Sequence, residues 1–446
     1  MGQLVFLLVG SEALRRRWYM LTLLALLLLA LALLLLTGAA PAVVSATTAL
    51  FGLLALLHGL LVTLSARPAA AQGGSWLNLA RGLALAAIGA LILARLAGAP
   101  LPAGPLAGLA FIVDGGLRIF GGQLMRFAAW RRVVLGGALE VLLGLALLAG
   151  WPIPGEQAVP VSLGVLLLIS GAVLLQLSWE LRRLEPEAAI LLLSVFGGRG
   201  WQDNAPVLPD GGSGPAAAPA HPLTIHVWTP AVSAGVKPSL PVINRYVAAM
   251  DSSGKVSTGH CALEAGPLYI SHYPANELAY APDQFAQTMR ATAENDQPGR
   301  FLPSLAAEIA EWCPPDQQLV FHHYDERRLR AYWAGYRQDD TYNTANRNCA
   351  ICVAAALEAA LEGRLASPRP WLRILRLLCN PDIWSAAVLR KHASSITWTP
   401  GSVLDYARAL REVVEPHEAH PAQRLRRAAR LLLGAWRRDS QDPVIR

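Results

Sequence analysis

The sequence predicts a multidomain protein in which an all-α membrane bundle precedes an α+β domain. Of the 446 residues, 54% are hydrophobic and only 15% are charged, which is too apolar for an ordinary soluble protein. The apolar residues are concentrated before residue 180. After a linker rich in Gly, Pro and Ala, strand-like runs come first and a helix comes late, an order typical of an α+β domain. The predicted segments are a membrane domain (1–185), a juxtamembrane segment with linker (186–222), the α+β domain (223–365) and a basic helical extension (366–446).

Six apolar runs of about 20 residues, the length that crosses a bilayer, predict six transmembrane helices. The runs cover residues 18–37, 42–65, 77–97, 104–125, 133–151 and 159–180. The first run alone could be a cleaved signal peptide, but that interpretation leaves the other five unexplained. We therefore predict six membrane spans.

A glycine pattern repeats through the spans. The second, fourth and sixth spans carry the pairs Gly52/Gly59, Gly108/Gly115 and Gly164/Gly171, and each pair begins 56 residues after the last. The third and fifth spans carry the weaker echoes Gly82/Gly89 and Gly137/Gly144. Small residues at such a spacing let helix backbones approach closely in lipid. The period predicts three copies of one helical hairpin.

Span order, repeat and length resemble the HdeD-like family of six-helix bacterial membrane proteins over about residues 10–185. This resemblance implies a link to acid stress and no defined biochemical activity. Arginines orient the bundle: they fall before the first span or after the second, fourth and sixth, at Arg15–Arg17, Arg67, Arg126, Arg131, Arg132, Arg182 and Arg183. Only Arg95 runs against this pattern. The positive-inside rule then predicts a multi-pass protein of the bacterial inner membrane with both termini in the cytoplasm.

Ionisable residues also lie within the spans. They are His58, Asp114, Arg118 and Glu140. Asp114 and Arg118 are one helical turn apart and can pair. Such residues form either a proton or ion path or a polar contact between helices.

The polar half contains a candidate nucleophile. Cys349 follows Asn348 at the start of an Ala/Leu-rich run with helical spacing, where free backbone N–H groups and the helix dipole favour a thiolate. His260 and His272 each lie six residues from Gly266, in a predicted hairpin. A turn centred on Gly266 places the two imidazoles opposite each other. We predict Cys349 as nucleophile, His260 as general base and His272 as the residue that orients His260.

A Gly-His strand, a polar residue on the next strand and a later Asn-Cys that opens a helix resemble the permuted papain-like superfamily. This superfamily includes circularly permuted NlpC-type hydrolases and relatives of lecithin retinol acyltransferase. The resemblance covers about residues 222–365. It implies hydrolysis or transfer of acyl groups on a peptide, an amide or a lipid ester, with Cys349, His260 and His272 in the nucleophile, base and third polar positions. Cys261 and Cys352 depart from the pattern, and backbone N–H groups are the candidate oxyanion hole.

Two other functions fit the same residues. Cys349 and Cys352 form a CxxC, which would suit a redox sensor. The α+β domain could instead bind a partner without catalysis, in a stress-response membrane protein. The five cysteines all lie in the polar half, which fits a reducing compartment rather than a disulfide framework. We expect no cofactor and no metal.

The C-terminal extension carries a basic amphipathic pattern. Leu425, Ala429, Leu432 and Trp436 share one helical face, and six arginines surround it. This pattern suits either contact with anionic lipid or a solvated helix face. Without a recognised fold or aromatic platform, we do not expect nucleic acid as a partner.

Overall fold

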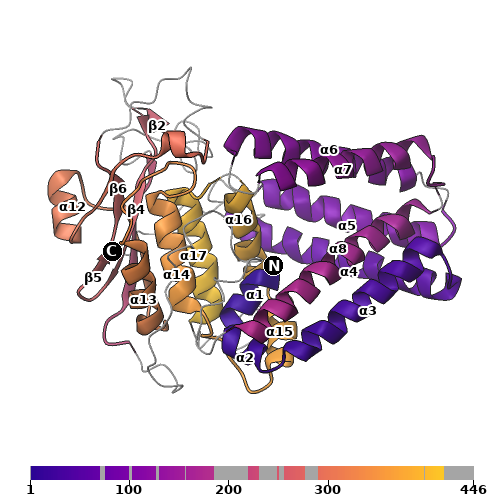
Figure 1. The fold of residues 1–446 in the computed structure, drawn as a ribbon, viewed down its shortest axis with the longest axis horizontal. Helices are drawn as coiled ribbons and strands as arrows, with labels where there is room; N and C mark the ends of the chain where they lie inside the picture. Colours follow the sequence, from indigo (N-terminus) through magenta and orange to yellow (C-terminus); the bar gives the residue numbers. More distant parts are fainter. Residues whose placement is uncertain are drawn as a thin grey trace, which may run out of the picture.

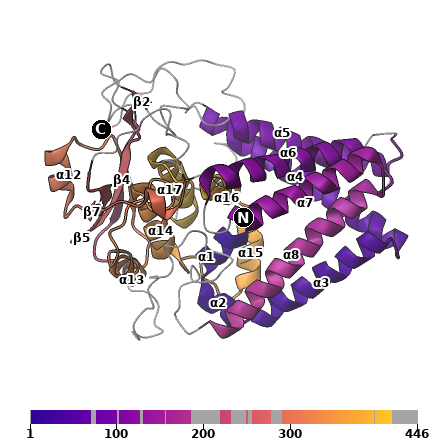
Figure 2. The ribbon, with the colours of Figure 1, turned by 45° about the horizontal axis from the view of Figure 1, so that its top comes forward.

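The computed structural model describes residues 2–70, 76–99, 103–126, 130–155, 157–184, 219–230, 249–250, 256–276, 290–395 and 397–415. An N-terminal helical region is followed by a mixed α+β region with an antiparallel sheet. In Figures 1 and 2, the α+β region lies at one end of the long helices. The predicted fold class is confirmed at this level.

All six predicted spans are helical. After the short helices α1 (Gly2–Val9) and α2 (Ser11–Arg15), the long helices are α3 (Trp18–Thr37), α4 (Pro41–Ala70), α5 (Trp76–Leu96), α6 (Ala103–Met125), α7 (Trp130–Ala149) and α8 (Ala158–Arg183). Within the described ranges, four helices are long and apolar enough to cross a membrane, namely α3, α4, α7 and α8. Their outward leucines are exposed, as lipid contact requires. Membrane crossing by α5 and α6 stays a prediction.

The long helices associate in three pairs. Helix α4 packs along α5, α6 packs along α7, and α8 packs along α3. Each of the first two pairs is a hairpin of two consecutive helices. The third joins the last long helix to the first, so only two of the three predicted hairpins are continuous in sequence.

The repeated glycines form the contacts within these pairs. A methyl group added at Gly137 of α7 would lie 2.7 Å from the carbonyl oxygen of Gly115 on α6. One added at Gly59 of α4 would lie 2.7 Å from the carbonyl oxygen of Gly82 on α5. Neither site has room for a Cβ atom, so the helix backbones touch directly. The weaker glycine pattern of the third and fifth spans therefore supplies the second glycine of each helix–helix contact.

Two adjacent glycines on α7 give a matched test of this packing. Gly137→Ala is expected to lower the thermal midpoint of the detergent-solubilised protein by several degrees, because its methyl group collides with the Gly115 carbonyl. Gly136→Ala is expected to leave the midpoint unchanged or raise it slightly, because nothing lies within 4 Å of its added Cβ and alanine favours a helix. Equal effects of the two substitutions would contradict the close α6–α7 contact.

The α+β region is built on a four-stranded antiparallel sheet with the order β5–β4–β1–β8. Its strands are β1 (Leu223–Trp228), β4 (His260–Ala265), β5 (Leu268–Ile270) and β8 (Gln317–Phe321). Two small ladders pair β2 (Ala249–Met250) with β3 (Val256–Ser257), and β6 (His272–Pro274) with β7 (Gly299–Phe301). The helices are η3 (Ala293–Asn295), α12 (Leu305–Glu311), α13 (Glu326–Tyr336), α14 (Cys349–Leu361), α15 (Pro370–Leu378), α16 (Pro381–Ser395) and α17 (Pro400–Val414).

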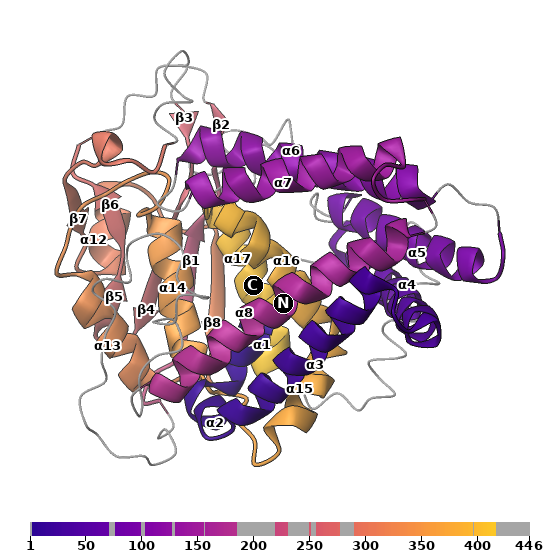
Figure 3. The same ribbon diagram turned by 45° about the vertical axis from the view of Figure 1, so that its right-hand side comes forward.

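Helix α14 is the centre of this region. All 13 of its residues are buried, and it packs on β4, α13 and α17. Figure 3 shows α14 beside the sheet, with α13 and α17 near it. Its many alanines let neighbouring elements approach closely, and Arg390 of α16 and Tyr406 of α17 bind the buried Glu358 carboxylate. The first residue of this enclosed helix is the predicted nucleophile.

Helix α1 belongs to the α+β region by packing, although it precedes the first span. Its leucines and valines share one hydrophobic core with α14 and β1. The amides of Gly363 and Leu365 donate to the carbonyls of Leu7 and Leu8 at 2.9 and 2.8 Å. The membrane and α+β regions are therefore joined at both sequence ends of the bundle, which the predicted boundary at residue 185 did not anticipate.

Polar side chains cap several helices of this region. Asp325 caps α13, and Thr399 caps α17 through a capping box with Ser402. Ser304 caps α12, which runs from Leu305 to Glu311. The predicted amphipathic face at 425–436 and most of the linker lie outside the described residues.

Candidate active site

Cys349 is the first residue of α14, and Asn348 fixes the start of this helix. The Asn348 side chain accepts a hydrogen bond from the Ile351 amide at 2.8 Å. Its Nδ2 atom donates to the carbonyl of Thr344 at 2.8 Å and to Thr397 Oγ1 at 3.1 Å. The cap is thus held from two sides, and the thiol sits where helix N–H groups favour a negative charge.

His260 begins β4, but the predicted hairpin register was wrong by one residue. Gly266 has a φ of 60°, and Ala265 pairs with Leu268. The turn therefore consists of two residues, Gly266 and Pro267, with glycine at the position where a type II′ turn needs it. Its centre falls after Gly266, so the register brings Tyr273 rather than His272 opposite His260. The His260 and Tyr273 rings stack with centroids 3.9 Å apart.

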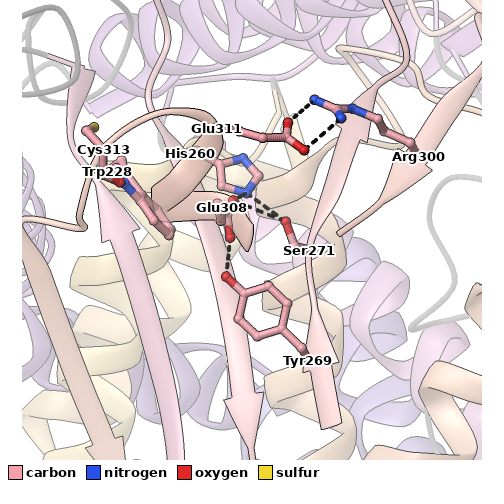
Figure 4. Close-up of polar contacts among 8 residues, drawn as sticks. All are labelled: Trp228, His260, Tyr269, Ser271, Arg300, Glu308, Glu311 and Cys313. Atoms are coloured by element: carbon pink, nitrogen blue, oxygen red, sulfur yellow. Dashed lines mark hydrogen bonds and ion pairs between the residues drawn. The ribbon is translucent and has the colours of Figure 1, made fainter. Parts of the chain in front are cut away.

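A buried carboxylate takes the orienting position that we predicted for His272. Glu308 on α12 is fully buried, and its Oε1 atom lies 2.8 Å from His260 Nε2. The hydroxyl of Ser271 donates to the same Oε1 atom at 3.2 Å, and Tyr269 donates to Oε2. Figure 4 shows His260, Ser271 and Tyr269 converging on this carboxylate.

Glu308 was not predicted from the sequence, because it lies 48 residues from His260 in the chain. One signal could have found it. Leu305, Glu308 and Trp312 fall on one face of the helix at i, i+3 and i+7, and Trp312 stacks on Trp228 of β1. A carboxylate in the middle of an apolar helix face needs a buried partner.

Cys349 and His260 interact electrostatically, and each changes the pKa of the other. Nε2 of the His260 ring faces the Glu308 carboxylate at 2.8 Å. Burial works to lower the pKa of His260, but Cys349 and Glu308 raise it to about 9. A hydrogen bond from Cys261 and the charge of His260 hold the pKa of Cys349 well below its usual range, against the effect of burial. These shifts favour a thiolate–imidazolium pair at neutral pH.

Cys261, the residue after His260, takes part in this arrangement. Burial and the neighbouring Cys349 raise the pKa of the Cys261 thiol well above its usual range. The Cys261 thiol therefore keeps its proton, and its interaction with the Cys349 sulfur lowers the pKa of Cys349.

His272 lies in a separate, buried aromatic pocket. Its Nδ1 atom is 3.0 Å from the Tyr336 hydroxyl, and its Nε2 atom is 3.1 Å from the Asp340 carbonyl. Burial lowers the pKa of His272 to about 4, so it is neutral, with Nε2 donating and Nδ1 accepting. Both nitrogens are occupied, and neither is available to orient His260.

His272→Ala is therefore expected to lower stability more than reactivity. Removing the ring leaves the Tyr336 hydroxyl and the Asp340 carbonyl without their hydrogen-bond partner, which lowers the free energy of unfolding by about 1–3 kcal/mol. The alkylation rate of Cys349 in the folded fraction is expected to stay within about twofold of the parent, since the ring does not touch the pair. Denaturant unfolding and iodoacetamide kinetics measure the two quantities. A large loss of Cys349 reactivity at unchanged stability would show that His272 acts in the site, as the sequence predicted.

The second cysteine of the CxxC gives the redox interpretation little support. Cys352 is fully buried one turn further along α14. Burial raises its pKa to about 12, although hydrogen bonds from Tyr332 and Tyr336 act in the opposite direction. A thiol with so high a pKa is a poor attacking group in disulfide exchange.

The pH dependence of the pair provides a direct prediction. The Cys349 thiolate is expected to react with iodoacetamide at neutral pH and well below it, because its folded pKa is lowered. An ordinary cysteine loses reactivity as the pH falls below about 8.5. Acyl transfer, which needs the imidazolium as a proton donor, is expected to fall as the pH rises through about 9 while alkylation continues. Coincident upper limits for the two reactions would contradict the assignment of His260 as the donor.

Asp114, Arg118 and Glu140 form a charged cluster between α6 and α7. Arg118 Nε lies 2.9 Å from Asp114 Oδ2 on the same helix and 3.1 Å from Glu140 Oε2 on α7. The predicted Asp114–Arg118 pair is present, and Glu140 extends it between helices. His58 of α4 packs against Trp384 of α16, with ring centroids 3.5 Å apart.

Comparison of the chain with protein-family models, with curated proteins and with solved structures finds no match. Both family resemblances stated from the sequence therefore stay predictions.

Proposed function

We propose that the protein is a membrane-anchored cysteine hydrolase or acyltransferase. The observation that carries this proposal is the buried chain of contacts from Cys349 through His260 to Glu308. A nucleophile at a helix start, a base in hydrogen-bond contact with it and a third group that orients the base are the three parts that covalent acyl transfer requires. The antiparallel sheet that carries His260 beside a helix that begins with Cys349 also supports the permuted papain-like interpretation.

In this mechanism the Cys349 thiolate attacks the carbonyl carbon of the substrate. The backbone N–H groups of Cys349 and Ala350 have no acceptor within the helix, because they belong to its first turn, and they stabilise the oxyanion. His260 donates its Nδ1 proton to the leaving amine or alkoxide, and a thioester on Cys349 results. Water or another acceptor then attacks the thioester, with His260 as base and Glu308 holding the ring.

The membrane placement limits the substrate. The carbonyl of Met125, at the arginine-bearing end of α6, accepts a hydrogen bond from the Ala291 amide of the α+β region at 2.6 Å, and α2 packs against α8. The arginine-bearing ends of these helices therefore adjoin the α+β region, which supports its location in the cytoplasm of a bacterium under the positive-inside rule. A cytosolic peptide or amide, or a lipid ester in the inner leaflet, is the substrate class that this location favours.

A thiol-reactive acyl probe tests the proposal. The probe is expected to label Cys349 in the full-length protein, as peptide mass spectrometry would show, and labelling is expected to weaken strongly in His260→Ala. Equal labelling of the two proteins would rule out His260 as the base. Absence of a label on Cys349 in a folded sample would favour the non-enzymatic, partner-binding alternative.

A further inference from the structure

Helix α15 presents an apolar stripe on its exposed side. Its opposite face, with Ile374 and Leu377, is buried against α1. Leu372 and Leu375 are 42% and 60% exposed, and Cys379, one turn further on, is also exposed. Within the described α+β region, few large apolar side chains are as exposed as Leu375. Such a stripe on a helix that is already packed on its other face needs a partner.

The position of α15 indicates what that partner is. Arg17, directly before the first residue of α3, donates from Nη2 to the carbonyl of Pro368 at 3.2 Å. This contact fixes the start of α15 beside the end of a membrane span. Figures 1 to 3 agree in placing α15 next to α1 and close to the α2–α3 junction.

Aromatic and basic side chains mark this level as a membrane interface. The Arg182 guanidinium lies 4.9 Å from the centre of the Trp18 ring, and that of Arg183 lies 4.4 Å from the Trp179 ring. Tryptophan rings with arginines beside them gather where the hydrocarbon of a bilayer meets its headgroups. These residues lie at the ends of α3 and α8, the ends that Arg17 connects to α15.

Arginines border the apolar stripe of α15. Arg376 follows Leu375 directly and is exposed, and Arg369 is exposed at the start of the helix. On a helical wheel both fall on one side of the stripe, toward Arg373. An apolar stripe with arginines along its border is the pattern of a helix that lies in the plane of a membrane interface.

We propose that α15 is an in-plane interfacial helix whose Leu372–Leu375–Cys379 stripe inserts into the phospholipid headgroup region beside α3, with its arginines at the lipid phosphates. The occupant of the exposed stripe is the lipid of the same bilayer that α3 crosses. This contact anchors the α+β region at a second point, independent of the chain connections to α3 and α8. It does not depend on the proposed catalytic function.

Cys379 offers a native reporter at the C-terminal end of the stripe. In a full-length chain with Cys313→Ser and Cys349→Ser, Cys261 and Cys352 are buried, so an environment-sensitive fluorophore would attach at Cys379. In vesicles of phosphatidylethanolamine and phosphatidylglycerol, lipids with a nitroxide near the headgroup are expected to quench this label. A matched control moves the label to Ile309→Cys on α12, which is 38% exposed and far from the long helices (Figure 1), in a Cys379→Ser background.

The expected result is quenching at Cys379 at least roughly twofold stronger than at the Ile309 position, together with protection from aqueous iodide. Leu372→Glu with Leu375→Glu, both on the exposed side, is expected to remove this difference while the thermal midpoint stays unchanged. Equal lipid quenching at the two positions would overturn the proposal, because the stripe would then face water. Protection from lipid and iodide alike would also overturn it, because protein would then cover the stripe.

Discussion

Cys349→Ser is expected to reduce acyl transfer by on the order of 10³-fold or more, the largest effect of any single substitution in the chain. A serine hydroxyl keeps its proton at neutral pH, and His260 cannot form an ion pair with it. The buried imidazolium then loses one of the two partners that raise its pKa. Turnover of a thioester or amide reporter, normalised to folded protein, measures the loss.

The other buried cysteine of α14 gives a matched control for Cys349. Cys352→Ser, one helical turn away, is expected to retain most of the activity, because its side chain contacts Tyr332 and Tyr336 rather than His260. Loss of activity in Cys352→Ser with full activity in Cys349→Ser would reverse the assignment and favour different thiol chemistry at this helix.

Glu308→Ala is expected to reduce both activity and stability. The substitution leaves His260 Nε2 and the Tyr269 hydroxyl without their shared acceptor in a fully buried site. Breaking one side of a buried ion pair costs about 3–5 kcal/mol. The pKa of His260 is also expected to fall, because Glu308 is one of its two raising partners, and the alkaline limit of acyl transfer should move to lower pH.

Glu311 provides the control on the same helix. It pairs with Arg300 at 2.7 Å, and both side chains are 45% exposed, so Glu311→Ala is expected to change stability by less than about 1 kcal/mol. Glu308→Gln separates charge from shape, because the amide can still accept a hydrogen bond from His260. It is expected to retain more stability than Glu308→Ala and to show the same downward movement of the alkaline limit. Similar, small effects at 308 and 311 would contradict a role for Glu308.

Local signals in the sequence were sufficient for most of the fold. The long apolar runs, the caps at Asp325 and Thr399 and the Asn-Cys helix start depend on neighbouring residues, and the structure contains each of them. The pairing of α8 with α3 could not be read in this way, because it joins segments about 140 residues apart. Insertion of α1 into the distant α+β core is another long-range contact of this kind.

The site was only partly predictable for the same reason. Cys349 and His260 each carry a local signal, and the structure brings them together. The prediction of the orienting residue depended on the length of the hairpin turn. A two-residue Gly266-Pro267 turn shifts every cross-strand partner by one position, and a shift of one residue turns a side chain to the other face of the sheet. Glu308 comes from a helix that packs onto the sheet, so its contact with His260 is tertiary.

The central claim is that Cys349 and His260 form a thiolate–imidazolium pair. The most direct measurement is the ultraviolet thiolate absorbance of the parent protein minus that of Cys349→Ser, recorded from acidic to alkaline pH. For the parent protein, we predict a full thiolate signal at neutral pH, which disappears only at a pH well below neutral. For His260→Ala, we predict that the thiolate signal appears only at neutral or higher pH. A signal that appears in the parent only at alkaline pH, as for a free thiol, would contradict the account.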